Sequence, residues 1–390
     1  MKRKKVLLFF LTISIISLSF GFGFYFGKLN CKICQPEDID FSLFWEAYHK
    51  LKENFIDQEK FDVQKIIYGA ISGMTQALGD PYTTFFSPSE TKTFLEDVKG
   101  EFEGVGMEIG IKNEKLMVVT PLEGTPAERA KVMAGDEILK IGDKLTEGMS
   151  VDEAADLIRG PKGTEVTLTL YREDWAEPKE IKLVREVIKI PTLKWEIKEG
   201  DIAYIKIYQF SEKINTDFQE AAIEILKSPA KKIILDLRNN PGGLLDKVVD
   251  VAGWFLEKEK VVVIEEKSDG QQKLYKSPGP GRFSTYPIVV LMNSGSASGA
   301  EILAGALRDD RGIMLIGENS FGKGSVQEPF DLSNDSMLKI TIAKWLTPKG
   351  KSIAEVGLAP DIEIKLTEED YEKGIDPQLN KAIEIIKGIE

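Results

Sequence analysis

One serine and one lysine, each placed after a predicted strand, have the residue types needed for nucleophilic catalysis. Ser298 follows the apolar run 288–292, and Lys323 follows the run 313–316. The carboxyl ends of consecutive parallel strands lie side by side, so Lys323 is expected to reach Ser298. A lysine acts as a base only where burial lowers its pKa, and the neutral amide of Gln327 is suited to orienting it. The pattern predicts Ser298 as nucleophile, Lys323 as base and Gln327 as its orienting residue.

The single histidine and the absence of a nucleophile-elbow motif limit which serine mechanisms are possible. The chain of 390 residues has a single histidine, His49, which falls in a predicted helix far from any strand end and reads as an ordinary helix residue. A Ser-His-Asp site is therefore excluded, and the segment from Gly295 to Gly299 has alanine where a G-x-S-x-G elbow has serine. Ser298 and Glu301 also have the spacing of a helix capping box, so this segment alone favours Ser298 as a helix N-cap over a nucleophile.

The apolar pattern predicts an α/β core preceded by two different segments. Residues 40–95 carry apolar side chains at helical spacing, and residues 100–172 read as short strands punctuated by glycine. After Asp174, buried strands alternate with helices of about ten residues, an order that implies parallel pairing. The strands are expected at 202–207, 233–237, 288–292 and 313–316, with helices at 215–226, 244–255 and 298–307.

The motifs around the serine and the lysine resemble those of the carboxy-terminal processing peptidases, a family of tail-specific serine peptidases. Gly295-Ser296-Ala297-Ser298-Gly299-Ala300-Glu301 and Phe321-Gly322-Lys323-Gly324-Ser325-Val326-Gln327 look like the family's two motifs, with Lys323 25 residues after Ser298. Asp236-Leu237-Arg238-Asn239-Asn240-Pro241-Gly242-Gly243 resembles its glycine loop. The resemblance implies an oxyanion site formed by backbone N–H groups of Gly242, Gly243 and Gly299. It extends over about residues 40–365.

Residues 100–172 resemble the PDZ domain that these peptidases carry before the catalytic core. Gly104-Val105-Gly106-Met107 matches the PDZ loop whose N–H groups bind a terminal carboxylate. The strand that follows would pair with the peptide by β-augmentation. The alternative is that Gly104 and Gly106 are only turn glycines.

The resemblance implies a crotonase- or ClpP-like α/β peptidase core with an N-terminal helical segment and an inserted, mostly-β PDZ domain. The predicted boundaries are an anchor or signal at 1–27, a linker at 28–39, the helical segment at 40–95, the PDZ domain at 96–174 and the core at 175–390. No cofactor or metal is expected. Cys31 and Cys34 form only half of a zinc motif, so a disulfide or two thiols are favoured over metal.

The N-terminus predicts a membrane location. Four basic residues at positions 2–5 precede the 22 uncharged residues from Val6 to Gly27, a length that spans a bilayer. The basic end is expected in the cytoplasm and the catalytic part outside, with a cleaved signal peptide as the alternative. The net charge of −12 and the absence of a later basic run argue against nucleic acid as a partner.

The predicted function is cleavage of extracytoplasmic proteins near their C-termini, which the PDZ domain recognises as free tails. Two other functions compete with this one. The first is a PDZ adaptor with an inactive core, against which the presence of all three residues argues. The second is a crotonase-like acyl-CoA enzyme, which an outer-face location disfavours. The sequence does not decide whether the chain forms a homo-oligomer.

Overall fold

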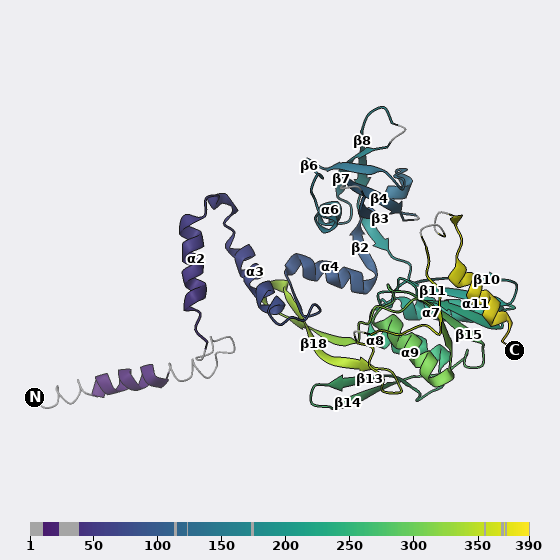
Figure 1. Cartoon of the computed structure of the whole chain (residues 1–390). Coiled ribbons are helices and arrows are strands. Elements are labelled where there is room, and N and C mark those ends of the chain that lie inside the picture. Colours follow the sequence, from purple (N-terminus) through teal and green to yellow (C-terminus); the bar gives the residue numbers. More distant parts are fainter. Residues whose placement is uncertain are drawn as a thin grey trace, which may run out of the picture. The chain divides into compact units, whose positions relative to one another are not determined.

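The computed structural model divides the chain into two compact units, residues 1–69 and 70–390 (Figure 1). No helix among the described residues is both long and apolar enough to cross a membrane. Much of the predicted anchor, together with Cys31 and Cys34, lies outside the described residues. The structure describes residues 11–22, 39–112, 115–122, 124–172, 175–354, 356–367, 370 and 373–389.

The predicted N-terminal helices are present. Helix α2 spans Ser42–Asn54, and its aromatic side chains pack edge to face, with the Trp45 and Tyr48 ring centroids 6.0 Å apart. A short 3-10 helix, η1 (Gln58–Lys60), precedes α3 (Val63–Gln76). His49 lies on α2, where its Nδ1 is 2.9 Å from the Trp45 carbonyl oxygen, as expected of an ordinary helix residue.

Strand β1 and helix α4 follow within the second unit. β1 spans Thr84–Phe86, and α4 spans Pro88–Lys99. Ser87 opens α4 because its N–H and hydroxyl both donate to the Glu90 carboxylate, at 2.7 and 2.6 Å. Gly100 ends the helix in the left-handed conformation, with φ of 72°.

The mostly-β unit that follows has a sheet in the order β3-β4-β5-β7-β8, with β6 paired to β5. Strand β8 pairs with β7, so this unit extends past the predicted boundary at residue 174. β3 is at the edge of the sheet, and β2 and β9 pair separately. The elements are β2 (Glu101–Gly104), β3 (Met107–Lys112), β4 (Lys115–Pro121), α5 (Pro126–Arg129), β5 (Glu137–Ile141), β6 (Lys144–Leu145), α6 (Val151–Ile158), β7 (Glu165–Tyr171), β8 (Lys179–Val184) and β9 (Glu186–Lys189).

The α/β core is a six-stranded sheet in the order β10-β11-β12-β15-β16-β19 (Figure 1). All its neighbours pair in parallel except β10 and β11, which confirms the predicted parallel core. Apolar clusters cover both faces of the sheet, one of them formed with α7, α8 and α9 and the other with α11. The elements are β10 (Leu193–Lys198), β11 (Ile202–Ile207), α7 (Ile214–Lys227), β12 (Lys232–Asp236), α8 (Leu245–Phe255), β15 (Ile288–Met292), α9 (Gly299–Arg311), β16 (Met314–Gly317), β19 (Ile362–Glu363) and α11 (Pro377–Lys387).

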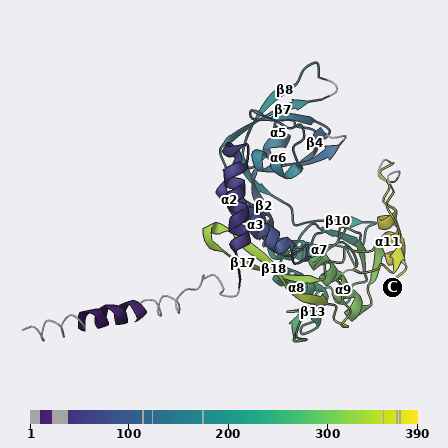
Figure 2. The same cartoon turned by 60° about the vertical axis from the view of Figure 1, so that its left-hand side comes forward.

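A second sheet, which the sequence did not predict, connects β1 to the core. Its order is β1-β18-β13-β14, and β17 also pairs with the long strand β18 (Figure 2). Lys323 lies two residues before β17, so this sheet positions the predicted base. The strands are β13 (Val261–Lys267), β14 (Gln272–Lys276), β17 (Ser325–Asp331) and β18 (Met337–Leu346), with the 3-10 helix η2 (Ser333–Asp335) before β18.

Candidate active site

Ser298 is held in a backbone conformation that serine rarely adopts. Its φ is 50° and its ψ is −112°, outside the extended region typical of a helix N-cap. A non-glycine residue in such a region costs about 1–3 kcal/mol and persists only where its surroundings enforce it. The side chain makes no cap hydrogen bond to α9, although the Ser298 N–H donates to the Glu301 carboxylate. The Ser298 side chain nevertheless faces the backbone N–H of Glu301 in the arrangement of a capping box, which orders the start of α9.

The buried carboxylate of Glu301 joins the serine loop to the lysine loop. Its Oε2 accepts the N–H groups of Ser298 at 2.8 Å and Lys323 at 3.1 Å. Its Oε1 accepts the Ser320 hydroxyl at 2.5 Å and the Gly322 N–H at 2.7 Å. All four contacts are donors, which suits an ionised carboxylate. Burial raises the pKa of Glu301, and these donors oppose that rise.

A further backbone hydrogen bond connects the same two loops, from the Phe321 N–H to the Ser296 carbonyl at 3.0 Å. Sequence reasoning identified Glu301 only as a capping residue. The spacing from Ser298 was the available signal, but the contacts to residues 320–323 depend on the fold. The structure thus brings together the two loops that carry Ser298 and Lys323.

Lys323 is half-buried, and burial lowers the pKa of its amine, while the negative charge of Glu301 opposes this. Its Nζ lies 5.4 Å from the centroid of the Tyr82 ring. Among the described residues, no hydrogen bond joins Lys323 Nζ to the Ser298 hydroxyl. Catalytic hydrogen bonds are often long in the absence of substrate, so this geometry is compatible with a serine–lysine pair.

Gln327 does not lie as its spacing suggested. It was expected to share an extended strand with Lys323, but Lys323 precedes β17 and a bulge interrupts the register between Val326 and Gln327. Gln327 Nε2 donates to the Ser325 hydroxyl at 2.6 Å. Among the described residues, Gln327 therefore makes no hydrogen bond to Lys323 that would support its predicted orienting role.

The glycine loop packs directly against the serine. A Cβ added to Gly242, whose φ is +100°, would lie 2.7 Å from the Gly299 nitrogen and 2.8 Å from Ser298 Cβ. The Gly242 N–H already donates to Asn240 Oδ1 at 2.8 Å. Among the described residues, the N–H groups of Gly243 and Gly299 have no such acceptor. The geometry therefore favours Gly243 and Gly299 as oxyanion donors, and Gly242 as the residue that permits close approach.

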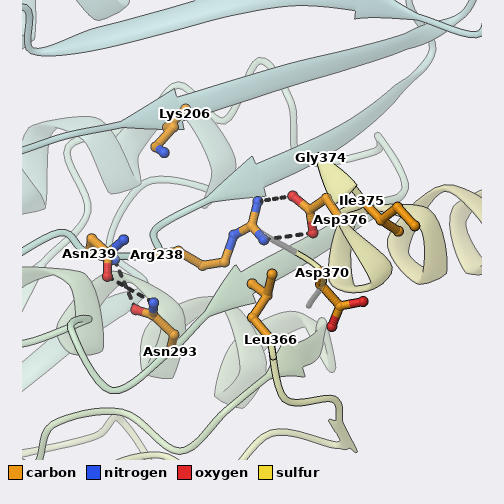
Figure 3. Close-up of a pocket in the computed structure, with 9 residues that line it drawn as sticks. All are labelled: Lys206, Arg238, Asn239, Asn293, Leu366, Asp370, Gly374, Ile375 and Asp376. Carbon is orange, nitrogen blue, oxygen red and sulfur yellow. Dashed lines mark hydrogen bonds and ion pairs between the residues drawn. The ribbon is translucent and has the colours of Figure 1, made fainter. Parts of the chain in front are cut away.

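Side-chain amides fix the two loops behind this site (Figure 3). Asn293 Nδ2 donates to Asn239 Oδ1 at 2.8 Å, and the Asn239 N–H donates to Asn293 Oδ1 at 2.9 Å. Beside them, Arg238 forms ion pairs with Asp236 at 2.7 Å and with Asp376 at 2.8 Å. Asp376 caps α11, so the C-terminal helix is linked to the glycine loop. A pocket of about 270 Å³ is bordered by Arg238, Asn239, Asn293 and Asp376, among others.

The neighbouring serines differ from Ser298. Ser296 is fully buried, and its hydroxyl donates to the Leu237 carbonyl at 2.8 Å and accepts the Asn293 N–H at 3.0 Å. Ser294 is exposed. Ser296 therefore holds the loop in place, and Ser298 is the serine best placed to react.

The predicted carboxylate loop borders a separate pocket of about 170 Å³. Its lining combines the loop with side chains of β3 and the end of α6. The position of β3 at the sheet edge leaves it available for an added strand. Gly106 has a φ of +75°, and a Cβ there would meet Thr125 at 2.4 Å, so only glycine fits. The lining residues are Phe102, Gly104, Val105, Gly106, Met107, Ile109, Ala155, Ile158 and Arg159.

Models of two known protein families match the chain, one in the α/β core and one in the mostly-β unit. The model of peptidase family S41 matches residues 201–364, and a PDZ domain model matches residues 117–172. The carboxy-terminal processing protease CtpA of Bacillus subtilis (strain 168) is 37% identical over 376 residues, covering 96% of this chain and 79% of the relative. The chain is a carboxy-terminal processing peptidase of family S41. It is accordingly a serine-type peptidase with a PDZ domain.

Other relatives agree with this assignment. A carboxy-terminal-processing protease of Bartonella bacilliformis is 41% identical over 325 residues, covering 82% of this chain and 74% of the relative. Among solved structures, a photosystem II D1 C-terminal processing protease matches with a TM-score of 0.53 and 29% identity, over 83% of this chain and 92% of that one. A putative S41 protease from Bacteroides fragilis has a TM-score of 0.54 at 15% identity, over 92% of this chain and all of that one, and supports the fold alone.

The Glu301 contacts give a first prediction. Glu301→Gln places an amide NH₂ where one oxygen accepts two donors, so at least one donor loses its partner at a cost of about 1–3 kcal/mol. We expect kcat/KM to fall by about ten- to a hundredfold and the melting temperature to fall as well. Glu90→Gln changes an exposed capping carboxylate on α4 and should alter neither strongly. Normal kcat/KM in Glu301→Gln would show that the loops do not depend on this carboxylate.

Proposed function

We propose that the chain cleaves proteins near their C-termini with Ser298 as nucleophile and Lys323 as general base. The observation that carries this proposal is the shared carboxylate of Glu301, which binds the backbone of both residues in a site packed against the glycine loop. The strained conformation of Ser298 and the burial of Lys323 support the same roles. Gln327 is assigned an orienting role that would require its amide to leave Ser325 when substrate binds.

In this mechanism, neutral Lys323 takes the proton from the Ser298 hydroxyl as the oxygen attacks the scissile carbonyl carbon. The negative oxygen of the tetrahedral intermediate would be stabilised by the N–H groups of Gly243 and Gly299, each worth about 3–4 kcal/mol. Lys323 then returns the proton to the leaving amine. Water attacks the resulting acyl-enzyme in the same way, with Lys323 again accepting and returning a proton.

The PDZ pocket is assigned the recognition of free C-terminal tails. The last residues of a substrate would pair with the edge strand β3, and its carboxylate would contact the loop from Gly104 to Met107. The lining is mainly apolar, which favours an apolar side chain at the substrate terminus. This assignment agrees with the names of the Bacillus and Bartonella relatives, which describe carboxy-terminal processing.

The apolar N-terminal stretch is assigned a membrane-anchoring role, with the catalytic part on the extracytoplasmic side. Two features support this assignment: the basic residues at positions 2–5 and the 22 uncharged residues from Val6 to Gly27 that follow them. Fractionation of cells that express the full chain, followed by protease treatment of intact spheroplasts, checks the location. A peptidase found only in the cytoplasmic fraction would contradict it.

Matched peptides that end in a free acid or an amide test the tail-specific function. Amidation removes the charge that the carboxylate loop binds, so we expect kcat/KM to fall by about tenfold or more. Ala155→Trp should remove the difference by filling the pocket, and it avoids the backbone strain that any substitution of Gly106 would introduce. Equal rates for both peptides in the unmodified enzyme would mean that the PDZ domain does not read the terminus. No cleavage of either peptide or of casein would reject the peptidase assignment.

A further inference from the structure

The turn that precedes β1 is held in shape by the side chain of Asp80. Its Oδ1 accepts the Tyr82 N–H at 3.1 Å, and its Oδ2 accepts the Thr83 hydroxyl at 2.6 Å. An aspartate that accepts hydrogen bonds from residues two and three positions later fixes the backbone between them. The turn therefore sets the place from which the Tyr82 side chain leaves the backbone.

The same turn is attached to the sheet that carries the lysine loop. The buried Thr83 hydroxyl accepts the N–H of Thr341 in β18 at 3.1 Å. Strands β1 and β17 both pair with β18 over residues 337–339, so they lie on its two edges. On the β17 side, Thr341 pairs with Gln327. Strand β18 therefore connects the Tyr82 turn to the strand that follows Lys323.

The Tyr82 ring lies against the amine of Lys323. Lys323 Nζ is 5.4 Å from the centroid of this ring, within the distance of about 6 Å over which a ring face attracts an ammonium group. Among the described residues, the amine has neither a hydrogen-bond partner nor an ion-pair partner. The Gln327 amide, which was expected to orient it, donates to Ser325 instead. The ring is therefore the contact that restricts the amine before substrate binds.

We propose that Tyr82 is a positioning residue of the peptidase site, whose ring holds the Lys323 side chain so that its amine is presented to the serine loop. This inference rests on the proposed role of Lys323 as base. A lysine side chain has a flexible four-carbon stem, and the bond from the Lys323 N–H to Glu301 fixes only where that stem begins. Tyr82 restricts the other end of the stem and acts on the reaction through Lys323.

Steady-state kinetics of the full chain on one free-acid peptide test this role. Tyr82→Phe keeps the ring, and the Tyr82 hydroxyl has no hydrogen-bond partner among the described residues, so kcat should stay within about twofold. Tyr82→Leu keeps an apolar side chain and removes the ring, so kcat should fall by about ten- to a hundredfold with KM nearly unchanged. Phe86→Leu is the matched control, because it removes a ring of the same segment that lies 5.1 Å from a different lysine, Lys339, and kcat should not change.

Three kinetic results would overturn the inference. A normal kcat in Tyr82→Leu would show that the amine does not depend on the ring. Equal losses in Tyr82→Phe and Tyr82→Leu would assign the effect to the hydroxyl. A rise in KM with an unchanged kcat would show that the ring binds substrate. If Tyr82→Leu does not fold, Tyr82→Met serves for the same comparison with Tyr82→Phe.

A spectroscopic measurement separates this inference from the peptidase mechanism. In Ser298→Ala protein labelled with ¹³C-lysine, the Lys323 Cε–Hε signal is identified by its absence when Lys323→Arg is added. A ring beside the amine displaces this signal, so Tyr82→Phe should keep the displacement and Tyr82→Leu should lose it. The same signal in all three proteins would overturn the inference. Loss of the displacement together with an active Lys323→Ala enzyme would reject the proposed base and not the ring contact, so the two failures are distinguishable.

Discussion

Ser298→Ala is expected to reduce peptide cleavage by at least about a thousandfold while the protein remains folded. The substitution removes the attacking oxygen, together with the side-chain half of the capping box that opens α9. The backbone N–H that donates to Glu301 is retained in alanine, so the loop keeps its attachment. Cleavage of casein and of a free-acid peptide measures the activity, and circular dichroism during heating measures the stability.

The neighbouring serines supply the controls for this experiment. Ser294 is exposed, and Ser294→Ala should retain nearly full activity. Ser296→Ala should lose stability by about 1–3 kcal/mol, since the Asn293 N–H and the Leu237 carbonyl lose their buried partner. Substantial turnover by Ser298→Ala would exclude this residue as the nucleophile.

Much of the peptidase core could be predicted because its strands are buried on both faces. Continuous apolar runs gave the bounds of β11 and β15 correctly, and the intervening helices implied their parallel order. The second sheet escaped prediction for a physical reason. Strand β18 carries lysines among its apolar residues and so lacks a continuous apolar run, and its partners β1 and β13 come from distant parts of the sequence.

For the site residues too, what depended on regular local structure could be predicted from the sequence, and what depended on contacts between distant segments could not. The proximity of the loops that carry Ser298 and Lys323 followed from two strand ends that neighbour each other in a parallel sheet. The four donors on Glu301 could not be predicted, because the capping-box spacing indicates only the bond to Ser298. Gln327 was misplaced relative to Lys323 because the alternation of a strand assumes regular pairing, and a bulge breaks it at this residue.

Lys323→Arg is expected to be as inactive as Lys323→Ala, a loss of about a thousandfold or more. Arginine preserves the positive charge but has a pKa above 12 and cannot give up its proton to become a base. If Lys323 supplied only charge to the oxyanion, arginine would retain most of the activity. The two substitutions therefore separate proton transfer from electrostatic stabilisation. The measurement is kcat/KM for one free-acid peptide, determined for each of the two variants.

The pH dependence of the unmodified enzyme should agree with this result. Only neutral Lys323 can accept the serine proton, so activity should rise with pH and level off above the pKa of the amine. Burial lowers that pKa below the usual value of about 10.4, and Glu301 limits the decrease. An active Lys323→Arg enzyme would show that Lys323 has a purely electrostatic role, and the base would then have to be another residue.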